Sequence, residues 1–247
     1  MSILLHGDCL EKLQSVDDNS VDFIFCDLPY GQTSCAWDTI IAWDPFWKEI
    51  LRVKKLNTPI FFTTTTKFGV SLINNAPKSC PFRYDLVWVK SAPAGFLSAK
   101  KMPMRKHEMV YCFYEKLPFY DLSSHKHKFL KREIKEENSN KNSVLYGDIK
   151  DNGYYKQRKS GEGTAYDPPL PNTLLEIKST RGKHSTEKPV ALMEWLLKYY
   201  SKEGDVVLDP TMGSGSTGVA CKNMNRNFIG IEKDPDIYEV AINRIEG

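Results

Sequence analysis

Three features are missing from this chain of 247 residues, and each absence excludes a class of protein. None of the six cysteines forms a Cys-x-x-Cys pair, so we expect neither a disulfide framework nor a zinc centre of that type. No apolar run approaches the roughly 18 residues of a transmembrane helix. The first residues lack the charged start and long apolar stretch of a secretory signal. The sequence therefore predicts a cytoplasmic protein without a membrane partner.

A strong excess of charge is also missing, because the formal net charge is only +3. The charge is unevenly distributed, however. Between Lys90 and Ser160 there are 16 Lys and Arg against 8 Asp and Glu, whereas the rest of the chain has 18 against 23. A basic middle segment favours a polyanionic partner, with a solvated lysine-rich surface as the plainer interpretation.

Hydrophobic patterning predicts strands and helices at both ends of the chain. The expected strands are the apolar runs at residues 3–5, 21–26, 59–63, 84–89, 109–114, 205–208 and 228–231. The expected helices cover residues 45–53 (with Asp44 as cap), 67–74, 190–200, 216–224 and 235–245. Alternation after residue 189 indicates a parallel, doubly wound sheet. Only the N-terminal strand is left to follow the last helix in space, so we expect an α/β fold with a circularly permuted order.

From Glu115 to about Ile177 the periodicity fails. A structureless connection of this length is unusual in a compact domain, so we interpret it as a functional insertion. His125 and His127 lie within it, but no suitably spaced cysteine or acid accompanies them, and no metal site is predicted.

A glycine-rich turn follows the strand predicted at 205–208, in the sequence Asp209-Pro210-Thr211-Met212-Gly213-Ser214-Gly215. Glycines there permit positive φ and close approach of the backbone to a ligand, and we expect Ser216 or Thr217 to cap the next helix. Glu232 ends the following strand, 17 residues after Gly215, where an acid can accept hydrogen bonds from ribose hydroxyls. Because Gly218 completes a G-x-G-x-x-G pattern, an NAD-dependent enzyme stays open on this motif alone.

A second motif, Asp27-Leu28-Pro29-Tyr30, ends the apolar run 21–26. The exocyclic amine of adenine is a poor nucleophile, because its lone pair is delocalised into the ring. Asp27 can accept one amine N–H, and the carbonyl of Leu28, held extended by the proline, can accept the other. Tyr30 offers a face on which an extruded base can stack. The plainer alternative is a turn after a buried strand, capped by an aspartate.

In this order, the two motifs resemble those of the S-adenosylmethionine-dependent amino-methyltransferases of DNA, in particular the β-class of adenine-N6 enzymes. His6-Gly7-Asp8-Cys9-Leu10 resembles the family segment near the cofactor adenine, and His184-Ser185-Thr186-Glu187-Lys188-Pro189 resembles the one at its methionine end. The resemblance covers the chain except about residues 115–180. It implies a circularly permuted Rossmann-like methyltransferase sheet, mostly parallel, with helices on both faces and an inserted target-recognition region.

The resemblance also implies roles for individual residues. The catalytic set is Asp27, Leu28, Pro29 and Tyr30. The implied cofactor is S-adenosyl-L-methionine, without a metal. Its binding set is Asp8, Cys9, Asp27, His184, Ser185, Lys188, Pro189, Asp209, Thr211, Gly213, Gly215, Ser216, Thr217 and Glu232.

Two comparisons with the family pattern refine the prediction. The family usually has proline where this chain has Leu28, but the acceptor there is a backbone carbonyl, so leucine should preserve it. The aspartate at position 27 favours adenine-N6, since cytosine-N4 enzymes usually carry serine. We predict a site-specific DNA adenine-N6 methyltransferase. A cytosine-N4 DNA enzyme, an RNA adenine enzyme and a catalytically idle DNA-recognition module stay open.

We expect three regions in the chain. Residues 1–114 form a catalytic half, 115–180 the target-recognition insertion, and 181–247 the cofactor-binding half of the same domain. The expected partner is double-stranded DNA, in the cytoplasm of a prokaryote and encoded by the host or a phage. A homodimer and a cognate restriction endonuclease stay open as further partners. The cations expected to hold phosphates are Lys100, Lys101, Arg105, Lys126, Lys128, Arg132 and Arg158.

Overall fold

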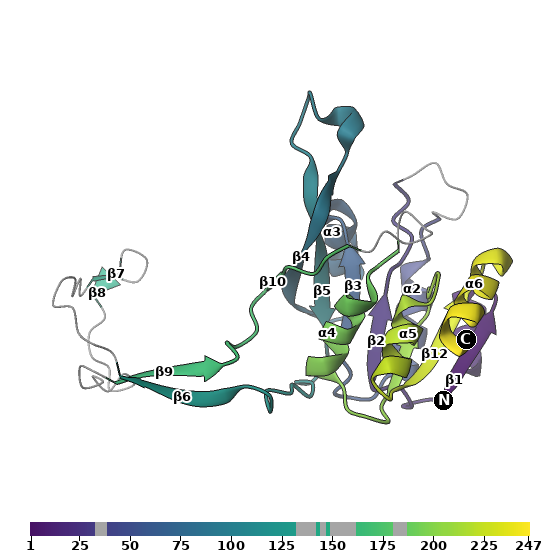
Figure 1. The fold of residues 1–247 in the computed structure, drawn as a ribbon. Coiled ribbons are helices and arrows are strands. Elements are labelled where there is room, and N and C mark those ends of the chain that lie inside the picture. Colours follow the sequence, from purple (N-terminus) through teal and green to yellow (C-terminus); the bar gives the residue numbers. More distant parts are fainter. Residues whose placement is uncertain (33–38, 132–141, 144–146, 149–161, 180–186) are drawn as a thin grey trace. The chain divides into compact units, whose positions relative to one another are not determined.

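The computed structural model describes residues 1–32, 39–131, 142–143, 147–148, 162–179 and 187–247 (Figure 1). The chain divides into two compact units. The larger comprises Met1–Asp121 and Asn172–Gly247, and the smaller comprises Leu122–Pro171. None of the helices in these described ranges has the length and hydrophobicity needed to cross a membrane.

The larger unit is built on an eight-stranded sheet with the order β1-β12-β11-β2-β3-β5-β4-β10. The bounds along the sheet are β1 Ser2–His6, β12 Asn227–Glu232, β11 Val206–Asp209, β2 Phe23–Cys26, β3 Ile60–Thr64, β5 Arg105–Phe113, β4 Phe82–Ala94 and β10 Leu174–Leu175. β5 is antiparallel to both neighbours, and every other adjacent pair is parallel. β1 lies beside β12, with Ser2 opposite Phe228 and His6 opposite Glu232. The predicted permuted and mostly parallel sheet is confirmed.

Helices cover both faces of this sheet, as predicted. Side chains alternate between the faces along each strand. On one face, Phe46 and Trp47 pack on Phe62, with ring centroids 6.2 and 5.6 Å apart. On the other, Tyr200 packs on Phe61 at 4.9 Å. The helices are α1 Cys9–Lys12, α2 Trp43–Val53, α3 Thr66–Asn75, α4 Val190–Tyr200, α5 Ser216–Asn223 and α6 Pro235–Glu246.

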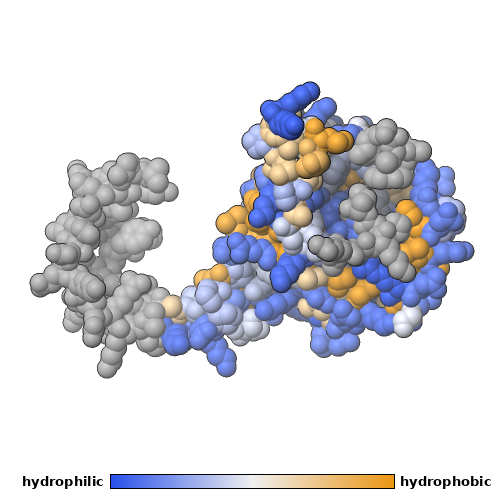
Figure 2. Space-filling view, turned by 45° about the horizontal axis from the view of Figure 1, so that its top comes forward, coloured by the Kyte–Doolittle hydropathy of each residue, from blue (hydrophilic) through white to orange (hydrophobic). Residues whose placement is uncertain are grey.

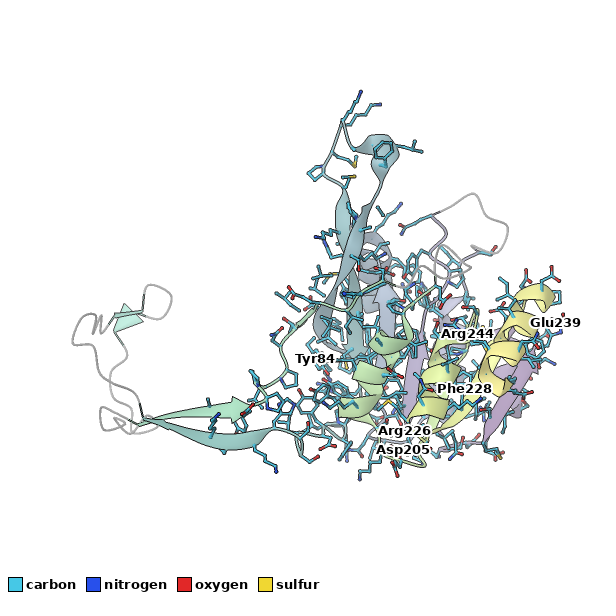
Figure 3. The ribbon with its side chains drawn as sticks, in the orientation of Figure 1. Tyr84, Asp205, Arg226, Phe228, Glu239 and Arg244 are labelled. Atoms are coloured by element: carbon cyan, nitrogen blue, oxygen red, sulfur yellow. The ribbon has the colours of Figure 1, made fainter. Side chains whose placement is uncertain are left out.

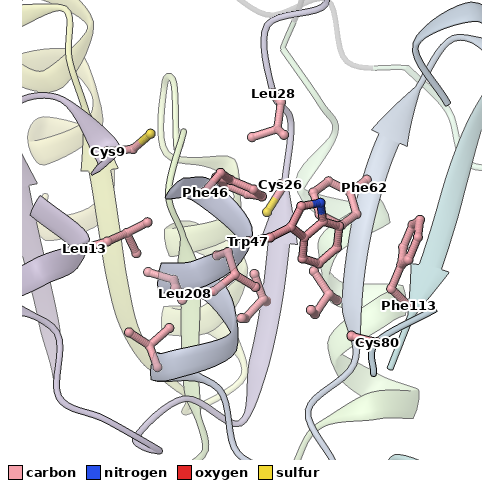
Figure 4. Close-up of a cluster of buried hydrophobic side chains, with 14 of the residues drawn as sticks. Cys9, Leu13, Cys26, Leu28, Phe46, Trp47, Phe62, Cys80, Phe113 and Leu208 are labelled. Carbon is pink, nitrogen blue, oxygen red and sulfur yellow. The ribbon is translucent and has the colours of Figure 1, made fainter. Parts of the chain in front are cut away.

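The buried cluster beneath α2 reaches past the end of β2 (Figure 4). Ile24 and Cys26 contribute to it from the strand, and Leu28 contributes from the corner that follows. Leu28 is only 3% exposed. Burial of a leucine side chain stabilises a fold by about 2 kcal/mol, so the side chain of Leu28 anchors the corner in the core.

The bounds of α2, β4 and β5 differ from the sequence-based expectation. α2 begins at Trp43 with Ala42 as its N-cap, so Asp44 lies in the first turn and the predicted cap is wrong. β4 and β5 are longer than their apolar runs, because their outer parts pair only with each other as a hairpin, from Val89 opposite His107 to Ala94 opposite Arg105. Such a hairpin needs no buried face, and its residues show no strand-like pattern.

The smaller unit contains regular structure that the sequence did not predict. β6 (Lys126–Lys131) pairs antiparallel with β9 (Glu162–Asp167), and β7 (Asn142–Ser143) pairs with β8 (Gly147–Asp148). The ribbon of β6 and β9 is largely polar, which removes the hydrophobic alternation by which strands are recognised.

Candidate active site

Polar side chains gather where the parallel strands of the larger unit end. Asp8 follows β1, Glu232 ends β12, Asp209 ends β11, Asp27 follows β2, and Thr63 lies near the end of β3. These strands are adjacent and parallel, so the five residues lie along one edge of the sheet. In the chain, β11 is followed by β12 on one side of it, and β2 is followed by β3 on the opposite side. The boundary between β11 and β2 is therefore a topological switch point. Open α/β sheets bind ligands at such a switch point.

The Asp27 carboxylate is held by hydroxyl and ammonium groups. Tyr30 donates its hydroxyl to Oδ1 at 3.2 Å, Thr63 donates to the same oxygen, and the Lys188 Nζ donates to Oδ2 at 2.6 Å. Two carboxylate oxygens offer about four acceptor sites. Oδ2 therefore has room for one more donor.

Lys188 links Asp27 to a second buried acid, Glu108. Its Nζ lies 3.3 Å from Glu108 Oε1, and the Nζ of Lys90 lies 2.6 Å from Oε2. Burial raises the pKa of Glu108, but the Lys188 and Lys90 ammonium groups outweigh it and leave the pKa below its usual value. Burial lowers the pKa of Lys188, yet Asp27 and Glu108 leave it above its usual value. Lys188 and Glu108 are therefore charged at neutral pH, and acids alternate with cations from Asp27 to Lys90.

Tyr30 joins the same network. Its ring packs on Phe68 with centroids 4.9 Å apart, and its hydroxyl lies 3.2 Å from Glu108 Oε1 as well as near Asp27. Burial, followed by the charges of Asp27 and Glu108, raises the pKa of Tyr30 well above its usual value. The phenol is therefore a neutral donor. Since Phe68 covers one face of the ring, only the other face can stack on a base.

The carbonyl of Leu28 receives no hydrogen bond from a described residue. The leucine side chain is buried, and Pro29 disfavours any but an extended backbone at this position. The carbonyl at position 28 therefore lies next to Asp27 without a partner among the described residues, and its role as an acceptor stays a prediction.

The glycines after β11 serve two purposes. Gly213 and Gly215 both have positive φ, 51° and 81°. No described atom lies within 4 Å of the place that a Cβ on Gly213 would take, so the backbone there borders open space. A Cβ on Gly215 would lie 2.8 Å from Ile245 of α6, and one on Gly218 would lie 2.4 Å from the same side chain. Gly215 and Gly218 therefore permit close packing of α5 on α6, and Gly213 is the one placed for ligand approach.

Asp209 is buried among neutral donors. The hydroxyl of Thr217 donates to Oδ2 at 2.6 Å, and the N–H of Thr211 donates to Oδ1 at 3.1 Å. Burial raises the pKa of Asp209 to about 7, and the two hydrogen bonds offset only part of that effect. The N-cap of α5 is Gly215, and neither Ser216 nor Thr217 caps this helix, which corrects the prediction.

The turn also contains an unsatisfied hydroxyl. The buried Oγ1 of Thr211 has no hydrogen-bond partner in the part of the chain that the structure describes. Leaving a buried polar group unpaired costs about 1–3 kcal/mol. Together with the open backbone at Gly213, this hydroxyl indicates that the turn is shaped for a ligand.

Arg244 of α6 holds the outer side of the turn (Figure 3). Its Nη1 donates to the carbonyl of Ser214 at 3.2 Å and to the hydroxyl of Ser216 at 3.3 Å, and its Nη2 lies 2.5 Å from Glu187 Oε1. Glu187 precedes Lys188 in the chain. Arg244 thus ties the glycine turn to the segment that delivers Lys188 to Asp27.

Glu232 and Asp8 frame the other end of the edge. Glu232 accepts from the N–H of Gly213 at 3.0 Å and from that of Asp234 at 2.8 Å. Asp8 is the N-cap of α1, and its second oxygen lies 3.2 Å from Lys233 Nζ. The side chain of Cys9 belongs to the buried cluster, and burial raises its pKa to about 12, so only its backbone can face a ligand. These groups suit an adenosine-containing cofactor, with acids for the ribose and an open backbone beside them.

The remaining predicted residues are dispersed. Pro189 is the buried N-cap of α4. Lys100, Lys101 and Arg105 lie on the β4–β5 hairpin, and Lys126 and Lys128 lie on β6 of the smaller unit. Among the described residues, no three His, Cys, Asp or Glu side chains are grouped as metal ligands. The predicted residues outside the described ranges are Arg132, Arg158, His184 and Ser185.

Sequence reasoning missed Thr63, Glu108 and Lys90 as parts of the site, and it missed the contacts of Glu187 and Arg244. Thr63, Glu108 and Lys90 lie in β3, β5 and β4, which are neighbours only through the order of strands in the sheet. A polar residue at or next to the end of each apolar run was the available signal. It could be used only after the antiparallel placement of β5 was known.

Comparisons with known proteins agree with this geometry. A family model described as DNA methylase (N6_N4_Mtase) matches residues 21–243. The chain is 27% identical to the Type II methyltransferase M.HinfI of Haemophilus influenzae, over 99% of this chain and 68% of the relative. It is 26% identical to the Type II methyltransferase M2.DpnII of Streptococcus pneumoniae, over 99% and 89%.

Solved structures share the fold. The structure described as the M1.HpyAVI–SAM complex has a TM-score of 0.63 at 22% identity and covers 99% of this chain and 100% of its own. The match with the family model spans nearly all of the larger unit and both motifs at the edge of its sheet. The chain is therefore a member of the N6/N4 DNA methylase family, the S-adenosylmethionine-dependent DNA methyltransferases.

Proposed function

We propose that this protein transfers a methyl group from S-adenosylmethionine to the N6 amine of an adenine extruded from double-stranded DNA. The observation that carries the proposal is the corner formed by Asp27 and Leu28. A carboxylate with a free acceptor site stands beside a fixed carbonyl, at the switch point of the sheet, in a member of the DNA methylase family. The aspartate at position 27 favours adenine over cytosine.

The cofactor is proposed to lie against the turn that follows β11. When bound, S-adenosylmethionine supplies a methyl group on a positively charged sulfonium, which is a good leaving group. The backbone at Gly213 and the Thr211 hydroxyl, which has no partner among the described residues, face the cofactor. Glu232 accepts hydrogen bonds from its ribose. Asp8 is the acid assigned to the adenine side, and the segment from His184 to Pro189 is assigned to the methionine end.

Asp27 and Leu28 act on the amine of the target adenine. Oδ2 of Asp27 accepts one N–H and the carbonyl of Leu28 accepts the other, so the nitrogen lone pair turns out of the ring plane. After transfer the nitrogen carries one proton too many. Asp27 is the base within reach of it, and it can pass that proton to solvent, because its side chain is 28% exposed.

We assign Lys188 to the positioning of Asp27 in addition to its predicted place beside the cofactor. Its ammonium lies 2.6 Å from the oxygen that must accept the amine, and Glu108 holds it from the other side. The ion pair therefore holds Oδ2 at the place where the amine N–H is to be accepted. Tyr30 and Thr63 fix the second oxygen of Asp27, which leaves the carboxylate plane no freedom to rotate.

The basic middle of the chain is proposed to grip DNA. Recognition of the target is assigned to residues 115–180, with 1–114 and 181–247 as the catalytic and cofactor-binding halves. Because the substrate is DNA, the expected location is the cytoplasm of a prokaryotic cell. A homodimer and a cognate restriction endonuclease remain part of this hypothesis as further partners.

The test is methyl transfer to plasmid DNA from a strain that lacks DNA methylation. The protein is incubated with tritium-labelled S-adenosylmethionine and the plasmid, and the DNA is then digested to nucleosides and analysed by mass spectrometry. We expect N6-methyldeoxyadenosine, and sequencing of the modified plasmid gives the recognition site.

Cytosine-N4 transfer is the competing outcome, because the fold does not distinguish the two bases. PvuII DNA methyltransferase, described as cytosine-N4-specific, has a TM-score of 0.66 at 16% identity and covers 98% of this chain and 86% of its own. N4-methyldeoxycytidine in the digest would overturn the adenine assignment. Cofactor binding without transfer to DNA would identify a catalytically idle module instead.

A further inference from the structure

The β4–β5 hairpin carries large apolar side chains at its tip. Phe96 and Leu97 are 82% and 100% exposed, and Met102 and Met104 are 61% and 42% exposed. Single exposed apolar residues are ordinary, but a group of four on one turn indicates a binding surface. Figure 2 shows hydrophobic and hydrophilic side chains side by side on the projecting hairpin.

The tip is a folded turn with its own hydrogen bonds. Gly95, at φ 93°, reverses the chain, and its carbonyl accepts from the N–H of Ser98 at 3.0 Å. Phe96 accepts from Ala99 at 3.0 Å, and Ser98 accepts from Met102 at 3.0 Å. The exposed side chains therefore stand on an ordered support.

The stem below the tip is braced against the sheet (Figure 1). Ser91 and Ser179 each donate a backbone N–H to the hydroxyl of the other, at 3.2 and 3.0 Å respectively. The indole of Trp88 donates to the carbonyl of Ile177 at 2.8 Å. These hydrogen bonds hold the hairpin in a fixed orientation, so its tip can press against a bound partner without the stem bending away.

The charge around the tip has one sign. Residues 91–107 contain four cations and no acid. Within the described ranges, none of the four has an acidic partner. The cations are Lys100, Lys101, Arg105 and Lys106. An apolar tip rimmed only by cations fits a polyanion that has an apolar interior.

The base of the hairpin is part of the Asp27 network. Trp88 of β4 lies opposite Glu108 of β5, and Glu108 contacts both Lys90 and Lys188. The hairpin thus begins at the edge of the sheet where Asp27 lies, and its tip projects beyond that edge (Figure 1).

We propose that this tip is a wedge that enters the base stack of DNA beside the target adenine and eases its extrusion. Phe, Leu, Met and Pro are the side chains that DNA-bending proteins insert between base steps, and all four types occur in residues 96–104. A two-stranded ribbon fits a DNA groove, and the surrounding cations take the phosphates. The inference rests on the proposed methyl transfer to DNA.

The test uses a duplex that carries the site found by plasmid sequencing, with 2-aminopurine at the target adenine. Its fluorescence rises when the base leaves the stack. A matched second duplex has an abasic position opposite the target, which removes most of the cost of extrusion. The variant is Phe96→Ser/Leu97→Ser, whose replaced side chains contribute little to the core. The control is Leu117→Ser, which changes another exposed apolar residue outside the hairpin.

We expect the double variant to lose at least about tenfold in methyl transfer to an adenine-containing matched duplex, with a parallel loss of 2-aminopurine fluorescence. On the abasic duplex the rate of methyl transfer by the double variant should come within about twofold of that of the unaltered protein. Leu117→Ser should match the unaltered protein on both duplexes. Equal activity of the double variant on the matched duplex would overturn the wedge. Equal losses on both duplexes would also overturn it, and would assign the tip to general DNA binding.

The unaltered protein separates this inference from the proposed function. If it transfers no methyl group to DNA, the proposed function has failed. If it is active and the double variant is equally active, only the wedge has failed.

Discussion

Two carboxylates lie at the ends of adjacent strands in this protein, and their surroundings differ. Asp27, after β2, pairs with the ammonium of Lys188 and keeps 28% of its side chain exposed. Asp209, at the end of β11, is 2% exposed, and among the described residues its carboxylate receives a hydroxyl and a backbone N–H. Burial raises the pKa of Asp209 to about 7.

The difference separates a charged corner from a structural one. An acceptor for an amine N–H must be held in place and be accessible, and Asp27 is paired with Lys188 and partly exposed. Asp209 needs neither an ion pair nor exposure, because its work is to hold Thr217 and the start of the glycine turn in place. The two acids can therefore be distinguished by substitution.

Asp27→Ala should have the largest effect, since it removes the charged acceptor. We expect transfer to fall by at least about 10²- to 10³-fold, while the dissociation constant of S-adenosylmethionine changes little. Tritium transfer and titration calorimetry measure the two quantities. Glu203→Ala, an exposed acid in the turn before β11, is the control and should leave both unchanged. Normal turnover of Asp27→Ala would refute the proposed mechanism.

Lys188→Met should leave Asp27 and Glu108 without the cation that they share, so that Asp27, like Asp209, has no ion pair with a described residue. Breaking a buried ion pair costs about 3–5 kcal/mol, and we expect a loss of this order in the free energy of unfolding, measured by chemical denaturation. Glu108 keeps Lys90 as a partner in this variant, so Asp27 is the acid left without a cation. Adding Glu108→Gln should restore part of the stability, because it removes the repulsion between the two carboxylates. If the single and double variants are equally stable, the network contributes nothing through charge.

Asp209→Asn should change how the free energy of unfolding depends on pH. The folded pKa of Asp209, about 7, lies above that of an ordinary aspartate, so the folded state holds a proton that the unfolded state has lost. Stability from this group is therefore present at low pH and declines between about pH 4 and pH 7. From pH 5 to pH 8 the decline should be roughly 2 kcal/mol. Asparagine resembles the protonated acid, so this variant should show a smaller decline in the free energy of unfolding, measured by denaturation at each pH. An unchanged decline would contradict the raised pKa of Asp209.

Glu232→Ala should have the smallest effect and should act on binding alone. Loss of its hydrogen bonds to ribose should raise the cofactor dissociation constant by about tenfold, as measured by calorimetry, with little change in transfer at saturating cofactor. Glu232→Gln keeps an acceptor for the N–H of Gly213, and its cofactor dissociation constant should lie between those of the unaltered protein and Glu232→Ala. Unchanged affinity in the alanine variant would count against the ribose role.

The sequence predicted the features that depend on local order. The Asp27 corner and the glycine turn are short motifs, each at the end of an apolar run, and the spare position beside the last helix led to the permuted sheet. For Leu28 the sequence predicted a role of the backbone carbonyl, and that role stays a prediction. The burial of the leucine side chain was not predicted, because the depth of a corner depends on α2 packing above it.

Features that depend on strand order were not predicted. Glu108 joins Asp27 only because β5 runs antiparallel between β3 and β4, and nothing in its own neighbourhood signals this. Gly215 resembled a ligand-binding glycine, yet it makes room for Ile245 of α6, some thirty residues later. The β4–β5 hairpin escaped notice because it has no buried face to impose a pattern.

The pairing of β1 with β12 has a consequence for folding during synthesis. The ammonium group of Met1 donates to the side chain of Asn227 at 3.0 Å, across a separation of 226 residues. β1 (Ser2–His6) is synthesised long before its partner strand β12 (Asn227–Glu232). The nascent chain must therefore keep Ile3, Leu4 and Leu5 from pairing elsewhere during that interval. Asp8, which follows β1, therefore cannot reach its place beside Glu232 until β12 has been synthesised.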